Sequence, residues 1–256
     1  MKKYGTSLLH RVRDEFGPIE IVQEQALLSL HFGTSSRQSC MDPEHPARLM
    51  LSYTRAMLAS LLFDPAPRSA LLIGLGGGSL LRFLSHHFPD CRLTAIEKRP
   101  LVASLAQEYF GLPQGSALIL ADGAQFVRDT PERFDLVLVD AYDGHGLAPA
   151  LFNPQFFADC QRILTEDGWL SINLWGGVAQ PLGYIEEHFP KVWRLPVRER
   201  GNLIVLASPK DAPESLRSAA LRARAEQFQR SLCLEFPLFL EDLQPSRRES
   251  HGLDVW

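Results

Sequence analysis

Between residues 70 and 208 the chain alternates short apolar runs with segments whose apolar residues have helical spacing. Near-continuous apolar runs are typical of strands that are buried on both faces of a parallel sheet. In chain order, the runs are ALLIG, CRLTAIE, SALILA, FDLVLVD, GWLSINLW, VWRLPV and NLIVLAS. They predict an α/β, Rossmann-like fold with a mostly parallel, seven-stranded sheet and helices on both faces, in which the last two runs form an antiparallel hairpin at the edge.

Different patterns flank this region. Residues 19–39 alternate polar and apolar side chains and predict two or three antiparallel strands. A helix is predicted over residues 46–62, followed by the breaker DPAPRS, and the C-terminal part contains one further helical segment. The expected organisation is a small N-terminal β extension (1–45), a ligand-binding domain (46–209) and a helical tail (210–256).

Composition limits the classes of function. The 256 residues carry a formal net charge of −4, and 22% of them are charged and 45% hydrophobic, which is ordinary for a globular protein. No basic excess favours nucleic acid or an anionic membrane as a partner, and no apolar run approaches the ~20 residues that span a bilayer. The N-terminus lacks the apolar stretch of a signal peptide, and the four cysteines form no C-x-x-C pair. We expect a cytoplasmic protein without a metal site and without a nucleic-acid or membrane partner.

A glycine cluster separates the first apolar run from its helix and consists of Gly74, Gly76, Gly77 and Gly78. Glycine is costly inside regular structure, so the cluster needs a physical reason. Without Cβ atoms, a flat ligand can lie against the turn, and the N-terminus of the following helix offers free N–H groups. The alternative is a close strand-to-helix crossing that requires no ligand.

Acidic side chains end or follow the next three predicted strands. Glu97 ends the second strand, Asp122 follows the third, and Asp140 ends the fourth, with Asp143 shortly after it. Ligands of an open α/β sheet bind beyond the carboxyl ends of its strands, so we expect these acids to meet at one edge. An acid about 20 residues past such glycines typically grips the ribose hydroxyls of a nucleoside.

The pattern favours an S-adenosyl nucleoside over NAD. Ser79 stands where the last glycine of the dinucleotide motif G-x-G-x-x-G belongs. Asp122 suits an adenine amino group, whereas a pyrophosphate prefers cations nearby. An S-adenosyl ligand carries a sulfonium and no phosphate. For Glu97 the alternative is a surface ion pair with Lys98 or Arg99.

Together these segments resemble the spermidine synthases, or polyamine aminopropyltransferases, over residues 19–209. The resemblance is carried by LLIGLGGGSL, LTAIEKRP, LILADGAQFV, FDLVLVDAYDGHG, LFNPQFFADCQRILTEDGWLSINL and NLIVLASP. This family has the class I methyltransferase fold with a small N-terminal β domain. The resemblance implies a homodimeric transferase that takes S-adenosylmethionine or its decarboxylated form as co-substrate and a small-molecule amine as acceptor.

The resemblance also implies roles for individual residues. Asp140 matches a catalytic aspartate that helps to deprotonate the attacking amine, and Asp143 matches a second aspartate that contacts the amine. Tyr142 lies between them, where it would shape the acceptor site. Glu97 would hold the ribose, and Asp122 the adenine amino group. The implied nucleoside site comprises Gln38, Gly74, Gly76, Gly77, Gly78, Glu97, Lys98, Asp122, Gly123 and Asp140.

The amine half of the site departs from the family pattern. In the usual G-G-G-D-G-G, the aspartate that grips the aminopropyl ammonium is Gly77 here. The family's Tyr-His-Glu motif falls near residues 52–54, which read Ser-Tyr-Thr here. The family's Asp-Ser-Ser-Asp loop reads Asp-Ala-Tyr-Asp, beginning at Asp140. The family's glutamine after the fifth strand is replaced by Asn173. Each lost charge-assisted hydrogen bond removes on the order of 1.5–3 kcal/mol, so recognition of a dication weakens. Gly77 also removes a repulsion toward the carboxylate of ordinary S-adenosylmethionine.

The residues leave three functions open. The first is aminopropyl transfer from decarboxylated S-adenosylmethionine to an amine. The second is methyl transfer from S-adenosylmethionine itself, and the third is a non-catalytic relative that binds a nucleoside or serves as an interaction module. Retention of Asp140 and Asp143 argues against the third.

Aromatic side chains are further candidates for the wall of a substrate pocket. Besides Tyr142, they are Tyr53, Trp175 and Tyr184. Aromatic residues at helical or strand positions more often belong to the core. For Tyr142 alone, which lies in the loop after the fourth strand, a place in the pocket wall is favoured over a place in the core.

Overall fold

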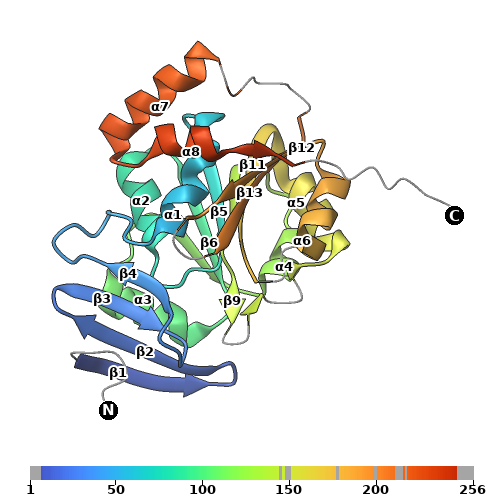
Figure 1. The fold of residues 1–256 in the computed structure, drawn as a ribbon. Coiled ribbons are helices and arrows are strands. Elements are labelled where there is room, and N and C mark those ends of the chain that lie inside the picture. The colour runs from blue at the N-terminus through green and yellow to red at the C-terminus, as the bar shows by residue number, and fades with distance from the viewer. Residues whose placement is uncertain are drawn as a thin grey trace, which may run out of the picture.

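A central eight-stranded sheet carries helices on both faces, and a separate four-stranded sheet lies at the N-terminal end (Figure 1). The structure is a computed structural model and describes residues 7–143, 146–147, 151–176, 179–198, 201–210, 216 and 218–246. The architecture confirms the predicted α/β fold with an N-terminal β extension.

The parallel part of the central sheet has the order β11-β8-β5-β6-β7. The bounds of these strands are β5 Ser69–Ile73, β6 Arg92–Glu97, β7 Ala117–Leu120, β8 Phe134–Val139 and β11 Leu164–Trp175. Every residue of β5 is buried, because both faces of the sheet are covered, and this explains the near-continuous apolar run. The chain crosses from β5 to β6 on one side and returns to β8 on the other, which opens a crevice at their carboxyl ends.

Three strands extend the sheet beyond β11, namely β12 Lys191–Pro196, β13 Asn202–Ser208 and β14 Gln244–Pro245. The predicted hairpin of β12 and β13 is present, and β13 lies between β11 and β12. The edge strand is β14, so the sheet has eight strands and not the predicted seven. A two-residue strand leaves no apolar run in the sequence, and it comes from the tail that the sequence predicts as helical.

The N-terminal sheet is an antiparallel meander of β1 Ser7–Asp14, β2 Gly17–Glu24, β3 Leu27–His31 and β4 Arg37–Met41. The sequence pattern misses β1, because SLLHRVRD is mostly exposed and has no buried face. Ile21 and Leu30 of this sheet pack with Val102 and Phe110 of α3. Since α3 begins just after β6, this packing places the sheet beside the carboxyl end of β6.

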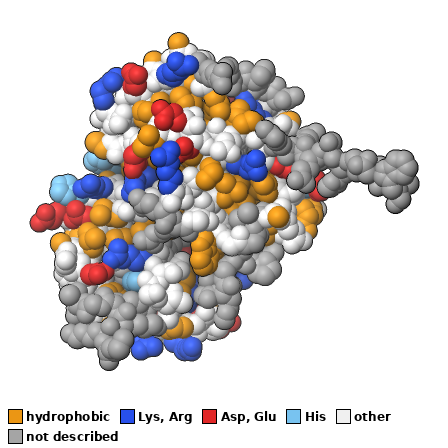
Figure 2. Space-filling model, viewed as in Figure 1, with side chains coloured by type: hydrophobic (Ala, Val, Ile, Leu, Met, Phe, Trp, Pro, Cys, Tyr) orange, Lys and Arg blue, Asp and Glu red, His pale blue; other side chains and the backbone are white. Residues whose placement is uncertain are grey.

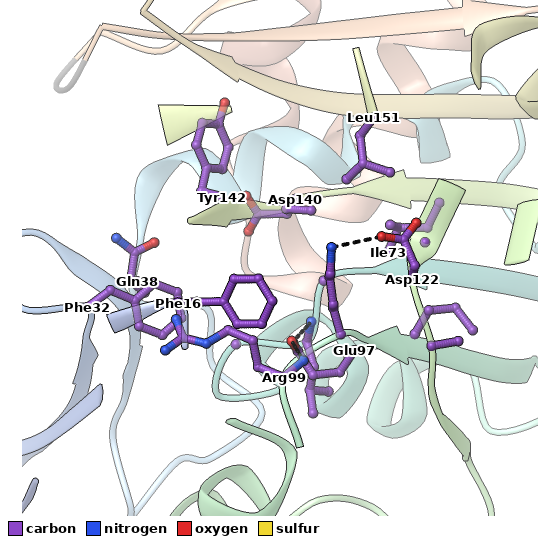
Figure 3. A pocket seen from close by; sticks show the side chains of 18 of the residues that line it. Phe16, Phe32, Gln38, Ile73, Glu97, Arg99, Asp122, Asp140, Tyr142 and Leu151 are labelled. Carbon is purple, nitrogen blue, oxygen red and sulfur yellow. Dashed lines mark hydrogen bonds and ion pairs between the residues drawn. The ribbon is translucent and has the colours of Figure 1, made fainter. Parts of the chain in front are cut away.

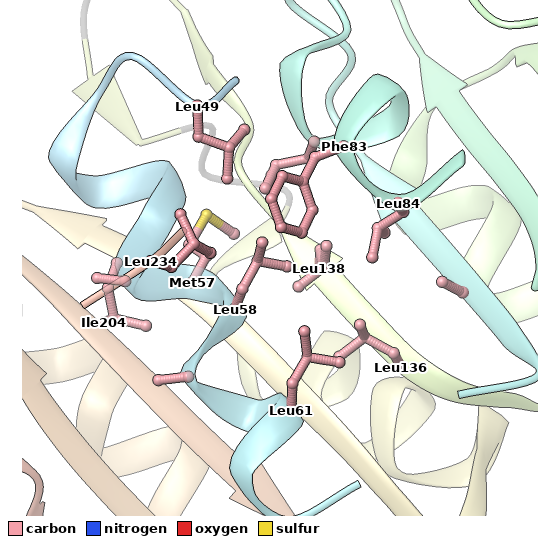
Figure 4. Close-up of a cluster of buried hydrophobic side chains, with 14 of the residues drawn as sticks. Leu49, Met57, Leu58, Leu61, Phe83, Leu84, Leu136, Leu138, Ile204 and Leu234 are labelled. Atoms are coloured by element: carbon pink, nitrogen blue, oxygen red, sulfur yellow. The ribbon is translucent and has the colours of Figure 1, made fainter. Parts of the chain in front are cut away.

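Side chains of each central strand alternate between two apolar layers. Ala70 and Leu72 of β5 pack with α1, η1 and α2 on one face, part of which is shown in Figure 4. Leu71 and Ile73 pack with α4, α5 and α6 on the other face. The helix bounds are α1 Ser52–Met57, η1 Leu58–Leu62, α2 Ser79–His87, α3 Pro100–Phe110, α4 Gly123–Asp129, α5 Pro154–Ile163, α6 Ala179–His188, α7 Ala219–Leu232 and α8 Phe236–Asp242.

Two helix predictions are corrected. The helix predicted over residues 46–62 begins only at Ser52, because Leu51 is extended, with φ −96° and ψ 134°. The segment before it is held instead by Arg82, whose Nε donates to the Pro46 carbonyl at 2.9 Å. The tail contains a second helix, α8, whose seven residues are too few to show a helical period.

The described surface carries charges of both signs. On the face shown in Figure 2, basic and acidic side chains are interspersed with apolar ones. No helix in the described part of the chain is long and apolar enough to cross a membrane. Among the described residues, no group of three or more His, Cys, Asp or Glu side chains is arranged to hold a metal ion.

Candidate active site

A cavity lies at the carboxyl ends of β5, β6 and β8, where the strand order reverses (Figure 3). Its lining includes every residue of the predicted nucleoside site except Gly77 and Gly78. The lining residues are Phe16, Phe32, Gln38, Ser39, Ile73, Gly74, Leu75, Gly76, Ile96, Glu97, Lys98, Arg99, Ala121, Asp122, Gly123, Asp140, Ala141, Tyr142 and Leu151. The acids that end or follow β6, β7 and β8 therefore meet at one place, as the sheet topology requires.

The glycine turn is tight because other parts of the chain approach it closely. A Cβ on Gly74 (φ +92°) would lie 2.2 Å from the Asp140 carbonyl oxygen, and one on Gly76 (φ +52°) would lie 2.6 Å from Ser39 Oγ. The left-handed backbone and the lack of space both require glycine at these two positions. The close neighbours are the end of β8 and β4, and not a helix crossing the strand, and the same two glycines also form part of the cavity wall.

A side chain at Gly77 would face β4 and α3. The Gly77 N–H donates to Ser39 Oγ at 2.7 Å. A Cβ at this position would lie 2.9 Å from Ser39 Cβ and 3.1 Å from the Phe110 ring. The aspartate that the family usually carries at this position would therefore have no room in this chain unless β4 or α3 shifted. Ser39 lines the cavity and presents its hydroxyl beside the turn.

We expect Gly77→Asp to destabilise the fold by about 1–3 kcal/mol, because it overpacks the contact with Ser39 and Phe110. The free energy of unfolding is measured by urea denaturation. Gly183→Ala is the matched control, because a Cβ there meets nothing within 4 Å. The control is expected to gain up to about 1 kcal/mol from helix propensity. A Gly77→Asp protein as stable as the wild type would contradict the close packing of this turn.

Glu97 is the buried acid at the end of β6, with 7% of its surface exposed. One carboxylate oxygen accepts the N–H of Leu75 at 3.0 Å, and the other accepts that of Arg99 at 2.9 Å. Burial raises the pKa of Glu97, and these backbone donors oppose the rise. The surface ion-pair alternative is wrong, because Glu97 is buried and Lys98 pairs with Asp122. A carboxylate offers about four lone-pair sites, so Glu97 can still accept a hydrogen bond from a ribose hydroxyl.

Asp122 caps helix α4 and also lines the cavity. Its Oδ1 accepts the N–H of Ala124 at 3.0 Å and of Gln125 at 3.2 Å. Its Oδ2 lies 3.0 Å from Lys98 Nζ, the contact that is dashed in Figure 3. Burial alone would raise the pKa of Asp122, but Lys98 and the backbone donors outweigh it and hold the pKa below its ordinary value. The predicted adenine contact must therefore share this carboxylate with Lys98.

Asp140 lies at the end of β8, across the cavity from Glu97 and Asp122 (Figure 3). Asn173 Nδ2 donates to Asp140 Oδ1 at 3.0 Å, and the Tyr53 hydroxyl also reaches this carboxylate. Burial raises the pKa of Asp140, while these two donors oppose the rise. A partly buried carboxylate with raised proton affinity suits a group that accepts a proton from an amine.

The loop after β8 brings Tyr142 to the cavity beside Asp140. The Tyr142 hydroxyl donates to the Asn173 carbonyl at 2.7 Å. Burial and the charge of Asp140 raise the pKa of Tyr142, so it remains a neutral hydroxyl. Asp143 belongs to the two-residue strand β9 (Tyr142–Asp143), which pairs with β10 (Gly146–Leu147). The Asp143 side chain lies outside the described part of the structure, and its contact with the amine stays a prediction.

The other three aromatic candidates do not line the cavity. Tyr53 is 8% exposed, and its hydroxyl lies 3.1 Å from the Gln38 carbonyl oxygen as well as near Asp140. Trp175 is 52% exposed at the end of β11, and Tyr184 lies on α6. Of these three, Tyr53 is the one that supports the site, because it contacts the lining residues Gln38 and Asp140 without lining the cavity itself.

The sequence patterns miss several of the lining residues, among them Ser39, Phe16, Phe32 and Arg99. The Arg99 guanidinium lies 4.4 Å from the centroid of the Phe32 ring. Its Nε and Nη2 donate to the two carboxylate oxygens of Asp14 at 2.9 and 2.8 Å. Phe16 lies in the turn between β1 and β2, and Arg99 lies just after β6, so neither belongs to a periodic face that a sequence pattern reveals.

The fold and the cavity together define a class of protein. A mostly parallel sheet with one antiparallel insertion, a glycine turn after β5 and a buried acid ending β6 describe the nucleoside-binding fold of class I methyltransferases. The family is narrower than the class, and comparison with known proteins identifies it.

Residues 50–173 match the spermine/spermidine synthase domain. The chain is 35% identical to the polyamine aminopropyltransferase of Chromobacterium violaceum, over 91% of this chain and 92% of the relative. It is 34% identical to the polyamine aminopropyltransferase of Neisseria meningitidis, over 96% of each. The chain belongs to the spermine/spermidine synthase family, which confirms the resemblance found in its sequence.

Solved structures share the fold. A probable spermidine synthase from Corynebacterium glutamicum superposes with a TM-score of 0.74 at 20% identity, over 88% of both chains. A spermidine synthase in complex with the transition state analogue AdoDATO gives 0.66 at 22% identity, over 80% of this chain and 75% of that one. Human methyltransferase-like protein 13 in complex with SAH gives 0.60 at 20% identity, over 79% and 98%. The predicted class I methyltransferase fold is thus confirmed.

Proposed function

We propose that the chain is an aminopropyltransferase, which moves the aminopropyl group of decarboxylated S-adenosylmethionine to an amine acceptor. Its relatives over nearly the full length are named polyamine aminopropyltransferase, which supports this activity. The observation that carries the proposal is that Asp140 and the buried Glu97 line the same cavity, on opposite walls.

In the proposed reaction, the amine nitrogen attacks the propyl carbon next to the sulfonium. The carbon–sulfur bond breaks, its electron pair returns to sulfur, and methylthioadenosine leaves as a neutral thioether. The nitrogen must shed a proton during the transfer, and the raised pKa of Asp140 suits it to orient the amine and take that proton. Glu97 would hold the ribose and Asp122 the adenine, while Tyr142 would shape the acceptor side.

We assign the rest of the predicted nucleoside site by position. Gln38, Lys98 and Gly123 would contact the nucleoside from the cavity wall, together with Gly74 and Gly76. Gly77 and Gly78 do not line the cavity and would contribute by keeping the glycine turn in its conformation. The proposed extension over residues 1–45 supplies lining residues to the cavity, and the proposed tail over residues 210–256 adds β14 to the sheet of the domain over residues 46–209.

Methyl transfer from S-adenosylmethionine is the second candidate function. The observation that favours it is the wall beside the glycine turn, where Ser39 presents a hydroxyl next to Gly77. A hydroxyl and backbone N–H groups can donate hydrogen bonds to the carboxylate of S-adenosylmethionine. An aspartate at this place would repel that carboxylate. A non-catalytic nucleoside-binding relative is the third candidate, and the position of Asp140 in the cavity argues against it.

The donor preference tests these candidates. We expect calorimetric titration to show tighter binding of decarboxylated S-adenosylmethionine than of S-adenosylmethionine, because an aminopropyltransferase takes the decarboxylated donor. Methylthioadenosine should also bind. Glu97→Ala is the control and should weaken all three ligands alike, because they share the ribose. A preference for S-adenosylmethionine would contradict aminopropyl transfer and support methyl transfer, and no binding by the folded protein would contradict both.

We further propose that the acceptor is a small-molecule amine, and that the protein acts in the cytoplasm as a homodimer without a metal, nucleic-acid or membrane partner. The family resemblance supports the dimer and the small acceptor. The net charge of −4 and the interspersed surface charges in Figure 2 argue against a polyanionic partner.

A further inference from the structure

A chain of amide hydrogen bonds leads from β13 to Asp140. Asn202 Nδ2 donates to Asn173 Oδ1 at 2.9 Å, and Asn173 Nδ2 donates to Asp140 Oδ1 at 3.0 Å. Asn202 and Asn173 are only 9% and 3% exposed. They lie on the adjacent strands β13 and β11, where Asn202 is paired with Trp175. Asn202 does not line the cavity, so it can influence the site only through its neighbour.

The direction of these hydrogen bonds is set by the chemistry of the three groups. An asparagine amide can present either its NH₂ or its oxygen to a neighbour, with nearly the same shape. The NH₂ of Asn202 takes the oxygen of Asn173, which leaves the NH₂ of Asn173 for Asp140. If the Asn173 amide turned over, oxygen would face carboxylate and NH₂ would face NH₂, and both contacts would be repulsive. Hydrogen bonds that all point toward one carboxylate also strengthen each other.

We propose that Asn202 is a positioning residue of the active site, which acts through Asn173 to keep a hydrogen-bond donor directed at Asp140. The inference rests on the proposed role of Asp140 as the group that takes the proton. Without that donor, the carboxylate loses one of the two contacts that oppose the effect of burial on its pKa. Asn202 thereby sets both the orientation of Asp140 and the pH range in which it is ionised.

Other groups around Asp140 form a background that substitution at Asn202 leaves in place. The Tyr53 hydroxyl of α1 lies near the carboxylate and lowers its pKa, and Tyr142 of β9 lies beside it with its hydroxyl on the Asn173 carbonyl. The charged residues that line the same cavity are Glu97, Lys98, Arg99 and Asp122. A change seen with an uncharged substitute for Asn202 is therefore attributable to the amide contact, whereas an aspartate there also adds a like charge near Asp140.

Asn202→Asp keeps the size of the side chain and replaces the donor by an acceptor, and its charge adds to the expected rise in the pKa of Asp140. Asn173 then turns its NH₂ toward position 202 and its oxygen toward Asp140. We expect the pKa of Asp140 to rise by about one unit or more, and kcat/KM at neutral pH to fall about tenfold or more, mainly through kcat. The pKa is measured by ¹³C NMR of aspartate-labelled protein, with Asp140→Asn to assign the signal.

Two further variants separate this role from a loss of packing. Asn202→Leu removes the donor without adding an acceptor, so the pKa of Asp140 should lie between those of the wild type and Asn202→Asp. Ile204→Val trims a buried side chain of the same strand and should leave that pKa unchanged. An unchanged pKa in Asn202→Leu would overturn the inference. Because the NMR measurement needs no turnover, a raised pKa in a protein without aminopropyl transfer would support the positioning role and contradict only the proposed function.

Discussion

Asp140→Asn is expected to lower the rate of aminopropyl transfer by about 10²–10⁴-fold at neutral pH, the usual contribution of a positioned proton acceptor. Asparagine keeps the shape of the side chain, and its oxygen can still accept the N–H of Asn173. It cannot accept a proton from the amine. Nucleoside affinity should fall less than the rate, because Glu97 and Asp122, which would hold the ribose and the adenine, are unchanged. Steady-state kinetics and calorimetry measure the two effects separately.

The prediction also fixes the direction in which the rate of transfer changes with pH. Asp140 must be ionised to take a proton, so the rate should fall as the pH falls through its pKa, and burial places that pKa above the ordinary range of an aspartate. Asp140→Asn should lose this acid limb. Asp159→Asn is the control, because Asp159 is buried on α5 and pairs with Arg162 away from the cavity. If Asp140→Asn kept more than a tenth of the wild-type rate, another group would be the acceptor, and Asp143 would be the next candidate.

The sequence predicts the parallel core and the acids at its edge for the same physical reason. The apolar runs that become β5, β6 and β8 are buried on both faces, so their length and position are visible without the structure. Once these strands are parallel, their carboxyl ends must meet, and Glu97 and Asp140 come together from segments more than forty residues apart in the printed sequence. No detail of side-chain packing is needed for that prediction.

The contacts that orient these acids depend on packing that no local pattern contains. The Asn202–Asn173 bond requires β13 to lie beside β11, and the hairpin pattern does not say which of its two strands pairs with β11. The bond between Arg99 and Asp14 joins residues 85 positions apart, and Asp14 ends a strand that has no apolar face. Such pairs are selected by the tertiary structure, so the sequence predicts the reacting groups better than it predicts the groups that hold them.

Asp14→Ala is expected to cost about 3–5 kcal/mol of unfolding free energy, because it leaves a buried guanidinium without its counter-charge. The side chains of Arg99 and Asp14 are only 6% and 15% exposed. Asp14 accepts two hydrogen bonds from Arg99, and its Oδ1 also accepts the N–H of Phe16 at 2.9 Å. The substitution thus removes the link between the β1–β2 turn and the segment after β6. Urea denaturation measures the loss.

Exposure decides the size of this effect, and a second ion pair provides the comparison. In the Lys210–Asp167 pair the side chains are 48% and 77% exposed, so Asp167→Ala should cost about 0–1 kcal/mol. Asp14→Asn keeps an acceptor oxygen and should fall between the two alanine variants, which separates the charge from the contacts. Phe16 and Arg99 both line the cavity, so Asp14→Ala should also weaken nucleoside binding, whereas Asp167→Ala should not. Equal losses of stability in the two alanine variants would mean that the buried pair does not hold the N-terminal sheet against the cavity.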